Sequence, residues 1–186
     1  MRRGLLAGLT TAMVLTLVAC GSDGGSTGSP VTSTTFAFDN AQWVKAGPKP
    51  SDSAKMVCST EAREDIDASL GIKAKKLEQT WVRKDHEYTC AYHYPHGTIR
   101  LEVKEMSTGD ETTAYFDQVK EQHGTAQELN GLGQGAWVLD NGNVLVRKDY
   151  KTLVVDVSDA PKVPAMRPSD VAINVASVIM SCWTGY

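Results

Sequence analysis

Cys20 stands in a sequence context that predicts lipid chemistry at its thiol. The chain begins with Met1 and the pair Arg2-Arg3, continues with an apolar stretch to residue 19, and reads Leu-Val-Ala-Cys-Gly over residues 17–21. Positive charge, a short apolar segment and small residues at the cleavage point are typical of an export signal too short to span a bilayer stably. We therefore expect residues 1–19 to be a lipoprotein signal peptide that is cut before Cys20, whose thiol then carries diacylglycerol.

The same segment predicts where the protein lies. Two or three acyl chains at the new N-terminus hold a protein stably on a membrane, where one chain would be marginal. We expect a lipid anchor in the cell membrane, with the domain on the extracytoplasmic face. An ordinary signal peptide that happens to contain a cysteine is the alternative, and the arginine pair leaves general secretion and twin-arginine export both open.

The remaining cysteines are Cys58, Cys90 and Cys182, and export places them in an oxidising compartment. Cys182 falls on the apolar stripe of an expected helix, where a buried thiol behaves as a small hydrophobe. Cys58 precedes another helix and Cys90 lies in an expected strand, so we favour a disulfide between these two. It would close a loop of about thirty residues, worth roughly 3 to 4 kcal/mol. The competing pairings join Cys182 to one of the others and leave a thiol for an intermolecular bond.

No pattern diagnostic of catalysis or metal binding stands out. His93 and His96, with His86 and nearby carboxylates, could form a surface metal site, but positions three apart on a strand point to opposite faces unless the turn rotates one of them. Residues 131–135 read G-x-G-x-G before a strand, whereas a phosphate-binding loop leads from a strand into a helix. Because no serine has a nucleophile-elbow context either, we predict no enzyme, metal or cofactor.

Composition divides the rest of the chain into a tether and one domain. Gly, Ser, Thr and Pro dominate residues 20–50, which predicts a flexible tether whose Phe36, Phe38 and Trp43 either dock on the domain or stay loose. Residues 51–186 have the size of a single domain with one core. The chain has 19 Lys and Arg against 22 Asp and Glu, with both signs interspersed. This balance argues against a nucleic-acid surface, which needs clustered positive charge.

Hydrophobic periodicity within residues 51–186 predicts an α+β domain. Helices are expected over residues 60–70, 110–123 and 168–182, each with a capping residue or proline at its start or a glycine at its end. Strands are expected near residues 77–83, 88–94, 99–103, 136–140, 144–147 and 152–157, with hairpin signals at 95–97 and 141–143. This order predicts an antiparallel sheet of about six or seven strands with the helices packed on one face.

Five aromatic residues of the expected strands could serve either the core or a binding surface. We expect core packing, with the tyrosine hydroxyls reaching the surface, and keep an exposed aromatic platform as the alternative. These residues are Trp81, Tyr88, Tyr92, Tyr94 and Trp137.

Three short motifs resemble those of a known family. Cys58 precedes a helix ending in Leu70-Gly71, residues 88–92 read Tyr-Thr-Cys-Ala-Tyr, and residues 131–136 read Gly-Leu-Gly-Gln-Gly-Ala before paired strands. Over roughly residues 56–182 the chain resembles small secreted actinobacterial lipoproteins with a domain of unknown function. The resemblance implies a PsbP-like α+β fold and a disulfide between Cys58 and Cys90, but no activity. Cys182 in the last helix departs from the family pattern.

These observations predict a membrane-anchored module that supports a protein complex in the cell envelope without catalysis. The alternative is a small-ligand binding protein that holds a lipid or a cell-envelope fragment between sheet and helices. A hydrolase of envelope polymers is a weaker alternative, since it needs a cleft joining His93 or His96 to carboxylates. An apolar pocket of roughly a few hundred cubic ångströms would favour ligand binding over a protein-interaction module.

Overall fold

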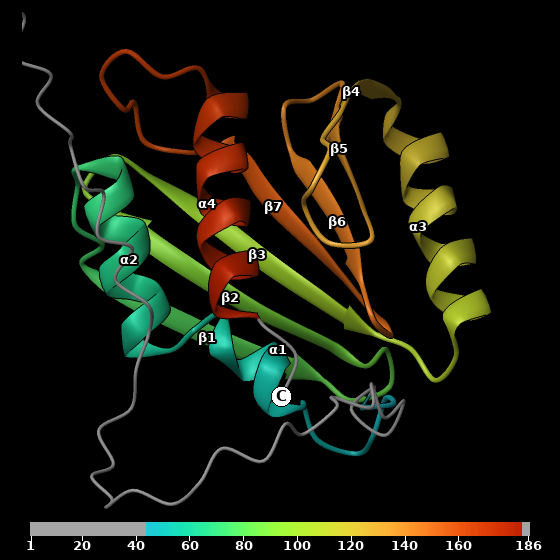
Figure 1. Cartoon of the computed structure of the whole chain (residues 1–186). Coiled ribbons are helices and arrows are strands. Elements are labelled where there is room, and N and C mark those ends of the chain that lie inside the picture. The colour runs from blue at the N-terminus through green and yellow to red at the C-terminus, as the bar shows by residue number, and fades with distance from the viewer. Residues whose placement is uncertain (1–43, 184–186) are drawn as a thin grey trace, which may run out of the picture. The chain divides into compact units, whose positions relative to one another are not determined.

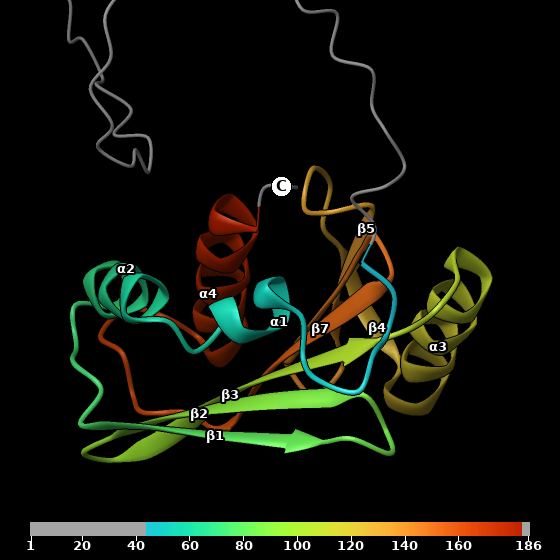
Figure 2. The ribbon, with the colours of Figure 1, turned by 90° about the horizontal axis from the view of Figure 1, so that it is seen from below.

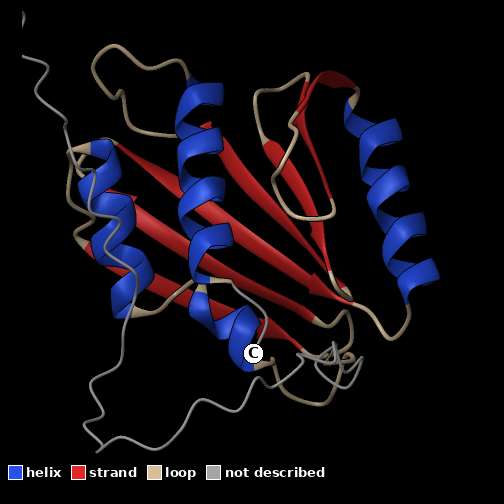
Figure 3. Ribbon diagram, viewed as in Figure 1, coloured by secondary structure: helices blue, strands red, loops and turns tan. Residues whose placement is uncertain are grey.

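The computed structural model describes residues 44–183, and within them the fold is α+β, as predicted (Figures 1 and 3). Cys20 and the aromatic residues Phe36, Phe38 and Trp43 lie outside the described residues. An antiparallel sheet of seven strands carries four helices. None of the helices in this described part is both long and apolar enough to cross a membrane.

The helices and strands follow the expected order, with two short additions. The helices are α1 (Asp52–Met56), α2 (Thr60–Leu70), α3 (Gly109–His123) and α4 (Pro168–Cys182). The strands are β1 (Lys76–Val82), β2 (Glu87–Tyr94), β3 (Gly97–Glu105), β4 (Thr125–Glu128), β5 (Gly135–Leu139), β6 (Val144–Lys148) and β7 (Lys151–Asp159). Their order in the sheet is β1-β2-β3-β7-β6-β5-β4, so β1 and β4 form its edges. The additions are α1 and β4, which are too short for a periodic signal.

The helix ends show why these segments are helical. The side chain of Ser59 accepts a hydrogen bond from the backbone N–H of Ala62, and Gly71 ends α2 in the left-handed conformation with φ 67°. The side chain of Thr108 accepts from the N–H of Glu111 at the start of α3. Each cap satisfies a backbone group that the helix itself leaves unpaired.

One face of the sheet forms the main core beneath α1, α2 and α4 (Figure 2). Strand alternation brings the buried side chains of β2, β3 and β7 to this face, where they meet the apolar stripe of α4. Tyr88, Tyr92 and Tyr94 are all buried there, which confirms core packing for the tyrosines of β2. The expectation that their hydroxyls reach the surface is wrong for Tyr92, whose hydroxyl is buried and donates to the carbonyl of Val57. Trp81 is half-buried against the main core, and Trp137 is half-buried against a smaller apolar cluster on the other face of the sheet.

The expectation that all helices pack on one face is wrong for α3. Phe116 and Val119 of α3 pack on Leu139 and Leu145, which alternate along β5 and β6 with the residues of the main core. The strands β5 and β6 are therefore apolar on both faces, and α3 covers the second face at this side of the sheet (Figure 2).

Within residues 44–183, no helix packs on this face over β1 and β2, and α3 approaches β3 only where Tyr115 lies beside Lys104. Strand register places polar side chains there, alternating with those of the main core. We call this surface the open sheet face; it is formed by Glu78, Thr80, Thr89, Arg100 and Glu102.

Candidate functional site

A pocket of about 660 Å³ opens where three loops meet at one end of the sheet. The loops are the one after α2, the turn between β2 and β3, and the segment that follows β7. We call it the end pocket. It is lined by Ile72, Lys73, Tyr94, Pro95, His96, Ala160, Pro161 and Lys162. It lies at the end of the sheet, not between sheet and helices as the ligand-binding alternative expected.

The loop after α2 is held in place by two side chains of that helix. A carboxylate oxygen of Asp67 accepts a hydrogen bond from the backbone N–H of Ala74 at 3.0 Å. The guanidinium of Arg63 donates to the carbonyl of the same residue at 2.5 Å. Both backbone groups of Ala74 are therefore satisfied, which fixes the path of Ile72 and Lys73 along the pocket wall.

The turn between β2 and β3 packs closely on the segment after β7. Tyr94 pairs with Gly97, so Pro95 and His96 form a two-residue turn. Gly97 has φ 138°, and a Cβ at this position would overlap the carbonyl oxygen of Asp159 and lie 2.8 Å from the backbone nitrogen of Pro161. Only glycine combines this backbone conformation with so close an approach, so Gly97 joins two walls of the pocket.

Tyr94 forms the inner wall of the pocket. Its side chain is buried, and burial raises the pKa of its hydroxyl, with the negative charge of Asp67 adding to the effect. The hydroxyl lies 3.5 Å from the Asp67 carboxylate that also holds Ala74. Tyr94 therefore remains a neutral, fixed surface at physiological pH.

The charged groups of the end pocket are all basic. Lys73, His96 and Lys162 are exposed on its lining, and no lining residue is acidic. Within residues 44–183, neither lysine takes part in an ion pair. Apolar and proline side chains supply the rest of the surface. A neutral apolar surface beside unpaired cations is suited to binding rather than to acid–base chemistry.

The three histidines proposed for a surface metal site lie apart. Only His96 lines the end pocket. A ring nitrogen of His93 lies 3.5 Å from the Glu78 carboxylate on the open sheet face, and His86 bonds to the carbonyl of Gly47 at the opposite end of β2. The described part of the chain brings no three His, Cys, Asp or Glu side chains together as a metal site.

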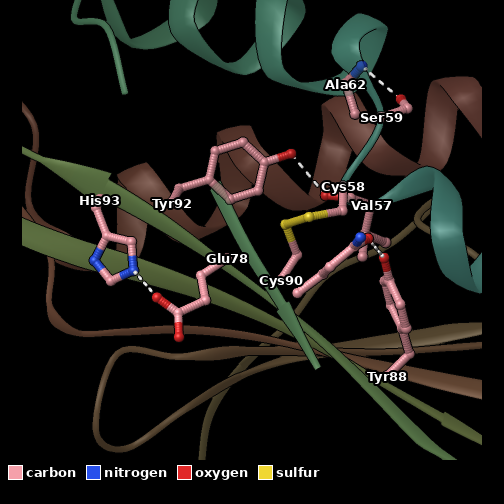
Figure 4. The surroundings of a disulfide bond; sticks show 10 residues. Val57, Cys58, Ser59, Ala62, Glu78, Tyr88, Cys90, Tyr92 and His93 are labelled. Carbon is pink, nitrogen blue, oxygen red and sulfur yellow. Dashed lines mark hydrogen bonds and ion pairs between the residues drawn. A yellow bond between two sulfur atoms is a disulfide. The ribbon is translucent and has the colours of Figure 1, made fainter. Parts of the chain in front are cut away.

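A disulfide joins Cys58 and Cys90, which confirms the favoured pairing (Figure 4). The two Cα atoms are 5.4 Å apart. Beside it, the hydroxyl of Tyr92 donates to the carbonyl of Val57 at 2.6 Å (Figure 4). The chain between α1 and α2 is thereby fastened to the middle of β2. Cys182 is buried outside this bond, with its sulfur 3.7 Å from the Asp65 carboxylate.

The opposite end of the sheet holds two buried charges under residues 44–51, which we call the strap. Glu105 and Lys151 face each other across β3 and β7 and are 2% and 3% exposed. Both carboxylate oxygens of Glu105 lie 3.3 Å from the backbone nitrogen of Ser51. The ammonium of Lys151 donates to the carbonyl of Val44 at 3.1 Å. Burial lowers the pKa of Lys151, and the negative charge of Glu105 opposes this shift.

Two further hydrogen bonds hold the strap. The backbone N–H of Ala46 donates to the carbonyl of Met106 at 2.9 Å, and the carbonyl of Gly47 lies 2.9 Å from a ring nitrogen of His86. The sequence assigns residues 44–50 to the tether because their composition resembles it. Their backbone bonds to distant residues have no local signal in the sequence.

Sequence reasoning also missed Lys73 and Lys162 as candidate binding residues. Each is one lysine in a loop, which resembles any solvated surface residue. The only local signal was the Pro95-His96-Gly97 turn, which indicated a hairpin but not what the hairpin packs on.

No protein-family model, no curated protein and no solved structure matches this chain.

Proposed function

We propose that this chain is an exported lipoprotein, anchored to the outer face of the cell membrane through Cys20, whose domain binds a small ligand without catalysing a reaction. The end pocket is the observation that supports ligand binding best. Its volume falls within the range of small-molecule sites, and most of its lining is apolar. The sequence context of Cys20 supports the anchor.

The chemistry of the pocket lining supports a role without catalysis. General acid–base catalysis needs positioned groups that donate and accept protons, and hydrolysis of envelope polymers would need a carboxylate within reach of the substrate. The lining offers one histidine, two lysines and no carboxylate. Neither a nucleophilic serine nor a cysteine lines it.

A protein-interaction module is the second candidate, and the open sheet face favours it. This surface is polar, and the seven-residue strand β1 beside it has one edge that no other strand of residues 44–183 pairs with. An edge strand offers backbone N–H and C=O groups to an added strand of a partner. Charged residues such as Lys76 and Glu78 on β1 work against nonspecific pairing there.

Analysis of what co-purifies with the protein tests the proposed function. The lipidated protein is purified from the membrane fraction, and the bound small molecules are extracted and identified by mass spectrometry. The matched control is Ala160→Trp, which fills the pocket from its wall and leaves the anchor and the open sheet face unchanged. We expect a molecule that is present with the wild-type chain and absent with Ala160→Trp.

Crosslinking in intact cells separates the two candidates. No pocket-dependent molecule, together with one dominant crosslinked protein that Ala160→Trp retains, would favour the interaction module. The anchor is tested separately, because Cys20→Ala should release the protein from the membrane fraction. Unchanged membrane retention of Cys20→Ala would contradict the anchor.

A further inference from the structure

We propose that the ligand of the end pocket is an amphiphilic anion, with a carboxylate or phosphate head between Lys73 and Lys162 and an apolar body against Ile72, Tyr94 and Pro161. This inference rests on the proposed function, because it names the class of ligand for the same pocket. The basic charges, the apolar wall and the fixed loops of the pocket each support this class of ligand.

The charge of the pocket is opposite to that of the chain. The chain has a formal net charge of -3, yet every charged side chain on the pocket lining is basic. Two acidic residues near the pocket do not line it: Asp67 holds Ala74, and Asp159 precedes the lining segment with its side chain exposed. Glu64 and Asp67 line the adjoining hollow on the α2 side of Lys73, yet neither forms an ion pair with Lys73. Lys73 and Lys162, which have no acidic partner among residues 44–183, attract an anion, and charge-assisted hydrogen bonds to it are stronger than neutral ones.

The apolar wall excludes a simple inorganic anion as the best ligand. Pro161 and Tyr94 are buried residues whose remaining surface faces the pocket, and Ile72 is half-buried beside them. Water on this wall is released when an apolar group covers it, which favours a ligand with a hydrocarbon part. A neutral lipid would use the wall but leave both lysines without a partner. An amphiphilic anion uses both.

The loops that carry the lysines are ordered without a ligand. Lys73 lies one residue before Ala74, whose N–H and carbonyl are both bonded to α2. Lys162 follows Pro161, whose backbone packs against Gly97. Binding therefore orders side chains but not backbone, which lowers the entropic cost of association.

Titration calorimetry with a matched set of probes tests the inference. The protein is the expected mature chain, residues 20–186, with Cys20→Ala, which removes the expected lipid attachment point. The probes are dodecanoate, dodecyl phosphate, dodecanol and dodecyltrimethylammonium, all below their aggregation concentrations. They share one tail and differ in the head. We expect both anions to bind, and dodecanol to bind about tenfold more weakly because the two lysine contacts are lost. The cationic probe should not bind.

Charge variants locate the binding. The variant Lys73→Gln/Lys162→Gln should bind dodecanoate about five- to tenfold more weakly and dodecanol unchanged. The matched control Lys45→Gln/Lys49→Gln changes the net charge equally at exposed positions outside the pocket lining and should bind like wild type. Comparison of dodecanoate with dodecyl phosphate shows whether a carboxylate or a phosphate head is preferred.

Each outcome separates this inference from the proposed function. Equal binding of dodecanol and dodecanoate, or an equal loss in both double variants, would overturn the anionic head and leave ligand binding in place. Binding by dodecyltrimethylammonium alone would likewise overturn the anionic head and leave ligand binding in place. Absence of binding by all four probes, together with no pocket-dependent molecule in the membrane preparation, would overturn both.

Discussion

The lysines at the two ends of the sheet differ in burial and in partners. At the strap, Lys151 is 3% exposed and donates to the carbonyl of Val44, while Glu105 supplies a buried negative charge opposite it. At the end pocket, Lys73 and Lys162 are exposed and have no acidic partner in the described part of the chain.

This difference indicates what each end is for. A buried charge needs partners from its own chain, because an unpaired charge in the interior costs several kcal/mol, in the range of ~3 to 5 kcal/mol when one partner is removed. An exposed lysine carries no such penalty and keeps its charge available to a ligand. We infer that the buried pair under the strap stabilises the fold and that the exposed lysines of the end pocket are available to a ligand.

The disulfide fastens the chain between α1 and α2 to the middle of β2, so its loss should have the largest effect. Cys58→Ser should lower the free energy of unfolding by roughly 3 kcal/mol, because the unfolded chain regains the freedom of the loop between residues 58 and 90. Cys182→Ser should cost about 1 kcal/mol or less, since it removes no covalent link. Denaturant unfolding of both variants under nonreducing conditions measures this, and equal losses would contradict the pairing.

Removal of the buried carboxylate of Glu105 should have the second-largest effect on stability. Glu105→Ala should lower the free energy of unfolding by about 2 to 3 kcal/mol, because the backbone N–H of Ser51 loses its acceptor and Lys151 loses its opposing charge. The loss stays at the lower end of the range for a broken buried pair because Lys151 keeps the carbonyl of Val44 as a partner. Its control is the double variant Glu105→Leu/Lys151→Met, which removes both charges and should recover part of the loss. An unchanged melting temperature of Glu105→Ala would contradict the claim that the buried charges at the strap stabilise the fold.

Gly97→Ala tests the packing of the pocket walls. The substitution adds a Cβ that meets the backbone of Asp159 and Pro161 at a φ of 138° that side chains rarely adopt. It should cost about 2 kcal/mol and weaken ligand binding by displacing the wall. Gly109→Ala is the control, because a Cβ there meets nothing within 4 Å. A stable Gly97→Ala that binds normally would show that this wall tolerates movement.

Features set by local interactions were predicted from the sequence, and features set by contacts between distant segments were not. The hairpin at Pro95-His96-Gly97, the capped helix α2 and the Cys58–Cys90 pairing were predicted because periodicity, caps and turn residues are local signals. The position of α3 on the second face was not predicted, because it depends on which strands become neighbours. The end pocket was not predicted for the same reason, because its three walls are distant in sequence and meet only through the order of the strands in the sheet.

Glu102 on the open sheet face is half-buried, between the buried charges at the strap and the exposed lysines of the end pocket. Burial raises the pKa of its carboxyl, and the negative charges of Glu87 and Asp156 add to the shift. Since the folded-state pKa lies above the unfolded one, the contribution of Glu102 to stability is present below the unfolded pKa and lost as the pH rises through the folded pKa.

Glu102→Gln should therefore raise the stability at neutral pH, by no more than about 1 kcal/mol, and flatten the change in stability over the mildly acidic range. Thermal unfolding as a function of pH checks this, with Glu128→Gln on the exposed edge strand β4 as the control. A variant less stable than wild type at pH 7 would contradict the sign.

The pocket lysines should have the smallest effect on stability. Lys73→Gln/Lys162→Gln should change the free energy of unfolding by less than about 0.5 kcal/mol, because neither side chain has an ion-pair partner within the described residues. Denaturant unfolding of the variant beside wild type measures it. A loss near that of Glu105→Ala would show that these lysines stabilise the fold, and the contrast between the ends would disappear.

The most direct test of the account is a map of ligand contacts on the whole domain. The expected mature chain, residues 20–186 with Cys20→Ala, is labelled with ¹⁵N, and backbone amide shifts are followed while dodecanoate is added. We predict saturable shifts at residues 72–73, 96–97, 160 and 162, which surround the end pocket, and unchanged shifts in the strap. Shifts confined to the open sheet face or to the strap, or no saturable shifts, would contradict the assignment of the end pocket as the binding site.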